Sequence, residues 1–143
     1  MPISSLIRVV AFTLVSLFLV GCQSGGKKSR ADRDGGHYGK VLKTEKGIAS
    51  YYSVRTNRGT RTASGRKLRD HELTAAHRRW AFGTPVRVTN LVNGNTVVVT
   101  VTDRGPHVRG RVIDVTMATA KKLDFVKRGL VPVKIEALEK LER

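Results

Sequence analysis

The middle of the chain alternates between apolar and polar residues, and this alternation predicts a β-hairpin. Residues 85–91 and 96–102 both follow the pattern, which matches the two-residue period of side chains along a strand. Asn93 and Gly94 separate the two segments, and this dipeptide is the strongest short-range signal for a hairpin turn. The sequence therefore predicts two antiparallel strands that share a buried face.

Short elements are also predicted before this hairpin. Residues 47–52 form a β-prone run, and residues 55–67 form a loop rich in arginine, glycine and threonine. Residues 73–77 fit either a helical turn or a short strand. The chain has 14 glycines and four prolines, which favour a turn-rich, mainly β fold over a helical bundle.

The C-terminal part adds two strands and a helix. Residues 112–115 form a strand, and Thr116 is placed to cap a helix of about two turns over residues 117–123. Residues 130–138 form the last strand, and Pro132 indicates that this strand lies at an edge or begins there. Short strands with turn signals and one or two short helices predict a small closed β-barrel.

The N-terminus predicts export. Arg8 precedes an uncharged apolar run over residues 9–20, which is too short for a membrane-spanning helix and fits a secretory signal. The next residues, Leu19-Val20-Gly21-Cys22, resemble a bacterial lipobox, in which the cysteine is lipidated and becomes the mature N-terminus. An ordinary signal peptide with an incidental cysteine is the alternative. Gln23, rather than Asp, resembles a signal for sorting to the outer membrane.

These signals predict the organisation of the chain. Residues 1–21 form the signal peptide, and residues 22–45 form a flexible polar tether in which Tyr38 is interpreted as part of the linker. Residues 46–138 form the barrel, and residues 139–143 form a tail. Lipidation at Cys22 would anchor the protein in the outer membrane, facing the periplasm.

The charge of the chain narrows its possible partners. The 143 residues include 27 Lys and Arg but only 11 Asp and Glu, which gives a net charge of +16. Nucleic acid would fit such a charge, but an exported lipoprotein rarely meets nucleic acid. Anionic polymers of the cell envelope fit better, because basic loops raise the rate of encounter with them. Eight basic residues gather in the loops around the expected cleft: Arg55, Arg58, Arg61, Arg66, Lys67, Arg69, Arg78 and Arg79.

Elimination of common sites leaves carboxylate chemistry. The single cysteine excludes an intrachain disulfide, and the four histidines lack the spacing of metal ligands, so we expect no metal or cofactor. Asp103 ends a valine-rich strand just before Gly105-Pro106, where a carboxyl group can sit in a cleft and act as a general acid. The alternative is that Asp103 only caps the turn through backbone N–H groups.

Several sequence blocks in one order resemble the rare lipoprotein A family. They are residues 47–52 (GIASYY), 62–65 (TASG), 73–77 (LTAAH), 82–91 (FGTPVRVTNL), 93–94 (NG), 102–106 (TDRGP) and 109–116 (RGRVIDVT). The resemblance implies a six-stranded double-psi β-barrel and a monomeric protein. It also implies lytic transglycosylase activity on peptidoglycan, with cleavage of the MurNAc–GlcNAc bond to 1,6-anhydro-MurNAc ends on strands poor in stem peptides.

The resemblance also assigns roles to individual residues. Asp103 is the expected acid/base, and Asp114 matches the family but is expected to be structural. Members of the family usually carry Glu directly after the TASG block, whereas this chain has Arg66. That departure supports the alternative of a non-catalytic, expansin-like module that binds peptidoglycan. The residues expected to bind substrate are His77, Arg104, Thr62, Tyr52 and Arg66.

Overall fold

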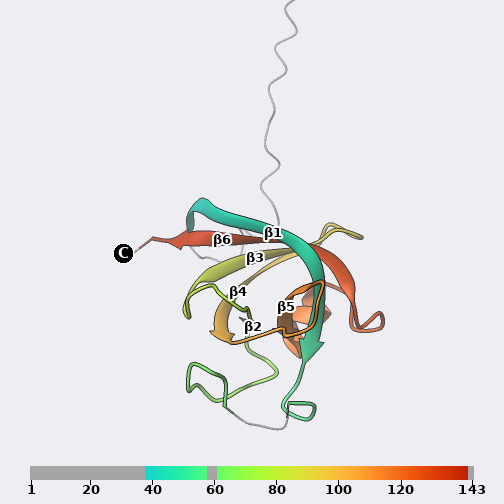
Figure 1. Ribbon diagram of the computed structural model, residues 1–143. Helices are drawn as coiled ribbons and strands as arrows, with labels where there is room; N and C mark the ends of the chain where they lie inside the picture. The colour runs from blue at the N-terminus through green and yellow to red at the C-terminus, as the bar shows by residue number, and fades with distance from the viewer. Residues whose placement is uncertain (1–37, 58–60, 142–143) are drawn as a thin grey trace, which may run out of the picture.

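The computed structural model describes residues 38–57 and 61–141, which contain six strands and one short helix. In chain order these are β1 (Tyr38–Tyr52), β2 (Thr74–Ala76), β3 (Pro85–Asn90), β4 (Thr96–Asp103), β5 (Arg111–Thr116), α1 (Met117–Lys122) and β6 (Val131–Lys140). The strands close into a barrel in the order β1-β5-β2-β4-β3-β6 (Figure 1). The pairs β1–β5 and β2–β4 are parallel and the others are antiparallel. The predicted mainly β barrel is confirmed.

The predicted hairpin forms between β3 and β4. Val88 lies opposite Val97 in the antiparallel ladder, and both side chains are buried. Gly94 has a φ of 76°, a conformation that glycine adopts without steric cost, and its N–H donates to the Asn90 carbonyl over 2.8 Å. The turn signal and the buried alternate positions together set the register of this pair.

The core lies inside the barrel and receives alternate residues from every strand. Ala49, Ala75, Val101, Ile113 and Ile135 come from five different strands, and each is fully buried. Leu123 and Phe125 follow α1 and close the barrel beside these residues. The opposite face of each strand is therefore available for polar side chains.

The folded domain begins earlier and ends later than the sequence predicts. β1 starts at Tyr38, so residues 38–45 belong to the barrel and not to the tether, and β6 continues to Lys140 inside the expected tail. The two added segments pair with each other, with Tyr38 opposite Lys140. Residues 40–44 are exposed, so this part of the strand has no buried face. Without a buried face, its sequence carries no alternation of apolar and polar residues that would predict a strand.

The leader, Cys22 and most of the tether lie outside the described residues, so their assignments stay predictions. Within the described residues, no helix has the length and apolar character that a membrane span requires. The segment 73–77 resolves as strand β2 rather than a helical turn.

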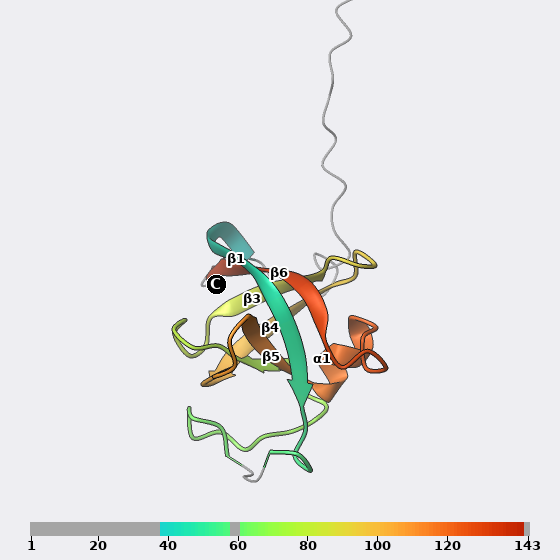
Figure 2. The ribbon, with the colours of Figure 1, turned by 45° about the vertical axis from the view of Figure 1, so that its right-hand side comes forward.

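Thr116 precedes α1 as predicted, but its side chain does not cap the helix. Its hydroxyl donates to the Glu72 carbonyl over 2.6 Å and also lies 3.0 Å from the Thr119 hydroxyl. Thr116 thereby ties the helix to the long segment between β1 and β2. In Figure 2 the described part of this segment lies below the barrel, next to the end of β1.

Candidate active site

Two carboxylates lie on either side of β2. Ala76 at the end of β2 pairs with Asp103 on β4 and with Asp114 on β5, and Asp114 pairs in turn with Ser50 on β1. Directly paired residues project to the same face of a sheet. The wall of the barrel therefore presents both carboxylates on one face, away from the apolar core.

Asp103 caps the turn through one of its two carboxyl oxygens. Its Oδ1 accepts hydrogen bonds from the backbone N–H groups of Ala63 and Arg104, each over 2.8 Å. Within the described residues, Oδ2 has no hydrogen-bond partner. Because both amides bind the same oxygen, the second oxygen is left to carry a proton or to meet a ligand. Asp103 thus caps the turn and still presents a usable carboxyl oxygen.

Tyr52 brings a phenol to the same face. Its hydroxyl oxygen is buried and has no partner at hydrogen-bond distance and angle in the described part of the chain. Burial, followed by the negative charge of Asp103, raises the pKa of Tyr52 well above its ordinary value of 10.0, and the Thr74 side chain offsets only part of this rise. The phenol therefore keeps its proton, and it lies near two carboxylates and the Thr74 side chain.

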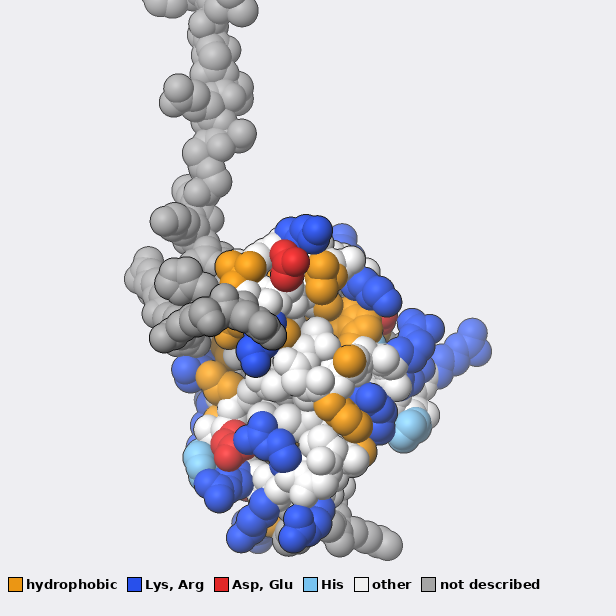
Figure 3. Space-filling view, turned by 90° about the vertical axis from the view of Figure 1, so that its left-hand side faces the viewer, with side chains coloured by type: hydrophobic (Ala, Val, Ile, Leu, Met, Phe, Trp, Pro, Cys, Tyr) orange, Lys and Arg blue, Asp and Glu red, His pale blue; other side chains and the backbone are white. Residues whose placement is uncertain are grey.

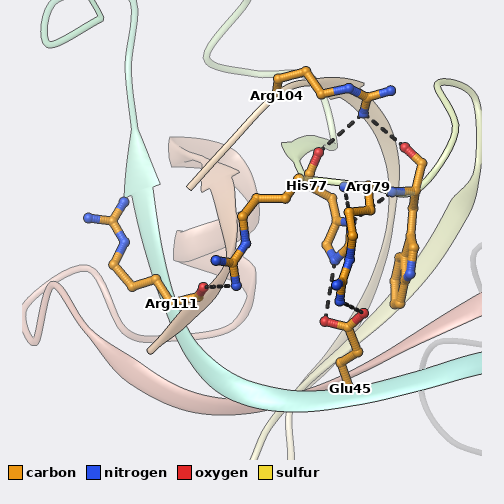
Figure 4. Close-up of polar contacts among 7 residues, drawn as sticks. Glu45, His77, Arg79, Arg104 and Arg111 are labelled. Carbon is orange, nitrogen blue, oxygen red and sulfur yellow. Dashed lines mark hydrogen bonds and ion pairs between the residues drawn. The ribbon is translucent and has the colours of Figure 1, made fainter. Parts of the chain in front are cut away.

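His77 is buried and faces Glu45, whereas the sequence placed it at the border of the cleft (Figure 4). Its Nδ1 accepts hydrogen bonds from the backbone N–H groups of Arg79 and Trp80, over 3.2 and 3.0 Å, and its ring stacks on Trp80. This acceptor role places the proton of the neutral ring on Nε2, which lies 3.6 Å from Glu45 Oε2.

The protonation state of His77 follows from its surroundings. Burial is the largest influence and lowers the pKa of His77 below 6.5, and the cations of Arg79 and Arg78 act in the same direction against Glu45. The ring is therefore neutral near pH 7. His77 contacts Asp103 through the backbone, because the backbone N–H of His77 donates to the Asp103 carbonyl over 3.1 Å.

Arg104 lies beside Asp103 in the chain, but its side chain turns away from acidic partners. Its Nη1 donates to the carbonyls of His77 and Trp80, over 3.1 and 2.9 Å (Figure 4). Its guanidinium also lies 3.8 Å from the centre of the Phe82 ring. Arg104 therefore clamps the turn after β2.

Thr62 and Arg66 belong to the loop that closes over Asp103. The Thr62 hydroxyl is buried and lies 3.0 Å from the Ser64 hydroxyl, and it donates to the Arg66 carbonyl. The Arg66 guanidinium is 58% exposed and lies 3.4 Å from Glu72. Thr62 therefore shapes the loop, whereas Arg66 is open to a ligand and is partly neutralised.

Sequence reasoning missed one acidic residue, Glu45, and it named Asp114 only as a structural residue. Glu45 was assigned to the tether, yet it lies against the buried His77. Asp114 is held by an ion pair with Arg111, and its side chain points away from the core because it alternates with the buried Ile113 and Val115. That alternation in residues 111–116 was the available signal for Asp114. No comparable signal marks Glu45, whose neighbours are exposed.

The described surface is strongly basic. Figure 3 shows Lys and Arg side chains spread over one face, with few acidic side chains between them. The predicted basic loop residues are described except Arg58, which lies outside the described residues. Within those described residues, no cluster of His, Cys, Asp or Glu has the arrangement to hold a metal ion.

Comparison with known proteins defines the class. Residues 44–135 match the family model described as lytic transglycolase, and the chain belongs to this family of double-psi β-barrels. Solved structures support the fold: Streptomyces papain inhibitor has a TM-score of 0.54 at 23% identity, covering 68% of this chain and 96% of its own. A Clavibacter michiganensis expansin, solved without ligand, has a TM-score of 0.55 at 21% identity, covering 71% and 53%. A mutant of that expansin was solved in complex with cellohexaose.

Curated relatives are named after RlpA, the rare lipoprotein A family. The probable endolytic peptidoglycan transglycosylase RlpA of Aquifex aeolicus is 40% identical over 125 residues, covering 87% of this chain and 50% of the relative. The endolytic peptidoglycan transglycosylase RlpA of Neisseria meningitidis is 44% identical, covering 66% and 39%, and that of Pseudomonas aeruginosa is 42% identical, covering 67% and 28%. The chain thus spans half or less of the length of these relatives.

Proposed function

We propose that this protein is a peptidoglycan lytic transglycosylase that cleaves the MurNAc–GlcNAc bond and leaves 1,6-anhydro-MurNAc ends. The observation that carries the proposal is the Asp103 carboxyl, which two backbone amides hold by one oxygen while the other oxygen has no partner among the described residues. The names of the relatives support the same chemistry. Strands poor in stem peptides are the proposed substrate.

One carboxyl group can perform both proton transfers of this reaction. The Asp103 acid donates its proton to the glycosidic oxygen as the bond to C1 of MurNAc breaks. The resulting carboxylate then takes the proton from the C6 hydroxyl of the same sugar, whose oxygen bonds to C1 and closes the anhydro ring. A hydrolase usually needs a second carboxyl to activate water or to attack the sugar. The ion pair with Arg111 supports a structural role for Asp114 beside this centre.

Tyr52 supports Asp103 in this mechanism. Its protonated phenol makes no well-formed hydrogen bond within the described residues, although the Thr74 side chain lies close enough to lower its pKa, and the charges of Asp103 and Asp114 both act on it. A sugar hydroxyl or ring oxygen bound there would accept a hydrogen bond from the phenol. The cost of the buried, unbonded hydroxyl in the free protein would then be recovered when the glycan binds.

A non-catalytic peptidoglycan-binding module is the second candidate. Two observations favour it: Arg66 stands where the family carries Glu, and Asp103 caps a turn. Digestion of purified sacculi separates the two candidates. Anhydro-muropeptides released by the full-length chain support the enzyme, whereas intact sacculi with bound protein support the module.

We also propose that Cys22 is lipidated, that the protein faces the periplasm from the outer membrane, and that it is monomeric. The sequence feature that supports the anchor is the Leu19-Val20-Gly21-Cys22 block after a short apolar run. The variant Cys22→Ser tests it, because the protein should then keep its signal peptide and be lost from the outer-membrane fraction. A variant that is still processed at residue 22 and still fractionates with the outer membrane contradicts the anchor.

A further inference from the structure

A cavity of about 400 Å³ opens on the Glu45 side of His77, apart from Asp103 and its loop. The first half of β1, the turn after β2 and the middle of β6 enclose it. Figure 4 shows Glu45 and Arg104 on opposite sides of His77, and the residues that line the cavity do not include Asp103, Asp114 or Tyr52. Its volume is in the range of sites that bind small ligands.

The charges of the cavity leave one cation unmatched. Glu45 lies 3.4 Å from Arg79, whose side chain is 78% exposed, and it also faces His77. His77 is neutral near pH 7, so Arg79 balances the charge of Glu45. Lys43 also lines the cavity and has no ion-pair partner within the described residues. The excess positive charge favours a ligand that carries a carboxylate.

Apart from Thr84, the rest of the cavity lining is apolar. Trp80 and Ala137 are almost completely buried and lie against it, and Leu42 is 53% exposed at its edge. The ladder between β1 and β6 changes register between Val41 and Lys43, directly at this edge. Such bulges redirect side chains and are frequent beside binding sites. The cavity therefore suits a ligand with an aliphatic part next to its charged group.

We propose that this cavity binds a short acidic peptide, with a carboxylate between Lys43 and Arg79 and aliphatic groups against Trp80 and Leu42. A neutral sugar would leave Lys43 unmatched, and a polyphosphate would place several charges against an apolar wall and Glu45. The inference rests on the proposed function in one respect, because the acidic peptide available to such an enzyme is the stem peptide of peptidoglycan. The cavity would then sense whether a neighbouring strand still carries its peptides.

Calorimetric titration of the full-length chain tests this proposal. The probes are the acidic stem tripeptide, released from sacculi by an amidase, and the same peptide with its carboxyl groups amidated. We expect the acidic peptide to bind at least about tenfold more tightly than the amidated one, as loss of a charge-assisted hydrogen bond implies. Equal binding of the two peptides, or no binding of either, overturns the proposal.

Variants locate the binding to the cavity. The double change Lys43→Gln with Arg79→Gln should weaken binding of the acidic peptide at least about tenfold. The matched control, Lys121→Gln with Lys127→Gln, removes the same charge from exposed positions at and after α1 and should bind normally. Ala81→Phe keeps every charge but fills the cavity edge, and it should also weaken binding. If both double variants lost the same affinity for the acidic peptide, the binding would depend only on the overall charge of the protein, and the proposal would be overturned.

Cleavage of peptide-free glycan by the wild type separates this inference from the proposed function. Anhydro products without peptide binding overturn only the peptide site. Peptide binding that follows the cavity variants, without any anhydro product, overturns only the transglycosylase.

Discussion

Ala63 donates its backbone N–H to Oδ1 of Asp103 over 2.8 Å, across 40 residues of sequence. The long segment between β1 and β2 is therefore fastened to the candidate acid itself. Ser64 adds a second link, because its N–H donates to the Thr102 carbonyl over 3.1 Å. The orientation of Asp103 therefore depends on the loop.

Tyr52→Phe should make the protein more stable and less active. The variant removes a buried hydroxyl that has no partner among the described residues, so unfolding should require up to about 1 kcal/mol more free energy. Activity should fall because the substrate loses a donor. Thermal unfolding and anhydro-product release are measured on the same preparation. Unchanged activity in a stabilised variant would remove Tyr52 from substrate binding and leave it a packing residue.

His77 should stabilise the fold through Nδ1, the ring nitrogen that accepts two backbone hydrogen bonds. His77→Ala leaves the amides of Arg79 and Trp80 without their acceptor and should cost about 1–3 kcal/mol of unfolding free energy. His77→Asn keeps an acceptor near the position of Nδ1 and should cost clearly less. Equal losses for the two variants, in denaturant unfolding at pH 7.5, would contradict this role.

The difference in stability between the wild type and His77→Asn should depend on pH. The pKa of His77 is lowered in the folded state, so as pH falls the unfolded chain takes up a proton first, near pH 6.5. The stability that the neutral ring contributes is therefore complete above pH 6.5 and is lost below it. The advantage of the wild type over His77→Asn should shrink between pH 7.5 and pH 5. A constant or growing advantage would contradict the buried, neutral ring.

Much of the barrel was predictable because burial imposes a pattern. The β3–β4 hairpin follows from its Asn-Gly turn and alternate buried valines, and Asp103 stands out at a strand end before Gly105-Pro106. The first half of β1 was not predictable, since exposed residues held by backbone hydrogen bonds leave no apolar period. The actual partners of His77 and Arg104 depend on contacts between distant segments, which local sequence does not encode.

Arg66 should limit turnover if a carboxylate is needed at its position. The single change to Glu would set two carboxylates together, because Arg66 lies 3.4 Å from Glu72. We therefore expect Arg66→Glu combined with Glu72→Gln to raise cleavage of peptide-free glycan above the wild type. Arg69→Glu with Glu72→Gln is the matched control, since Arg69 is similarly exposed and lies 3.7 Å from Glu72. No gain with an intact fold, or the same gain in the control, counts against position 66.

Asp103→Asn tests the proposed chemistry most directly. Asn keeps an oxygen for the amides of Ala63 and Arg104, so the melting temperature and binding to sacculi should change little. The titratable group is lost, so release of 1,6-anhydro-muropeptides should fall by roughly 10²–10⁴-fold, the usual contribution of general acid–base catalysis. A folded Asp103→Asn protein that releases anhydro-muropeptides at the wild-type rate would contradict the assignment of Asp103 as the acid/base.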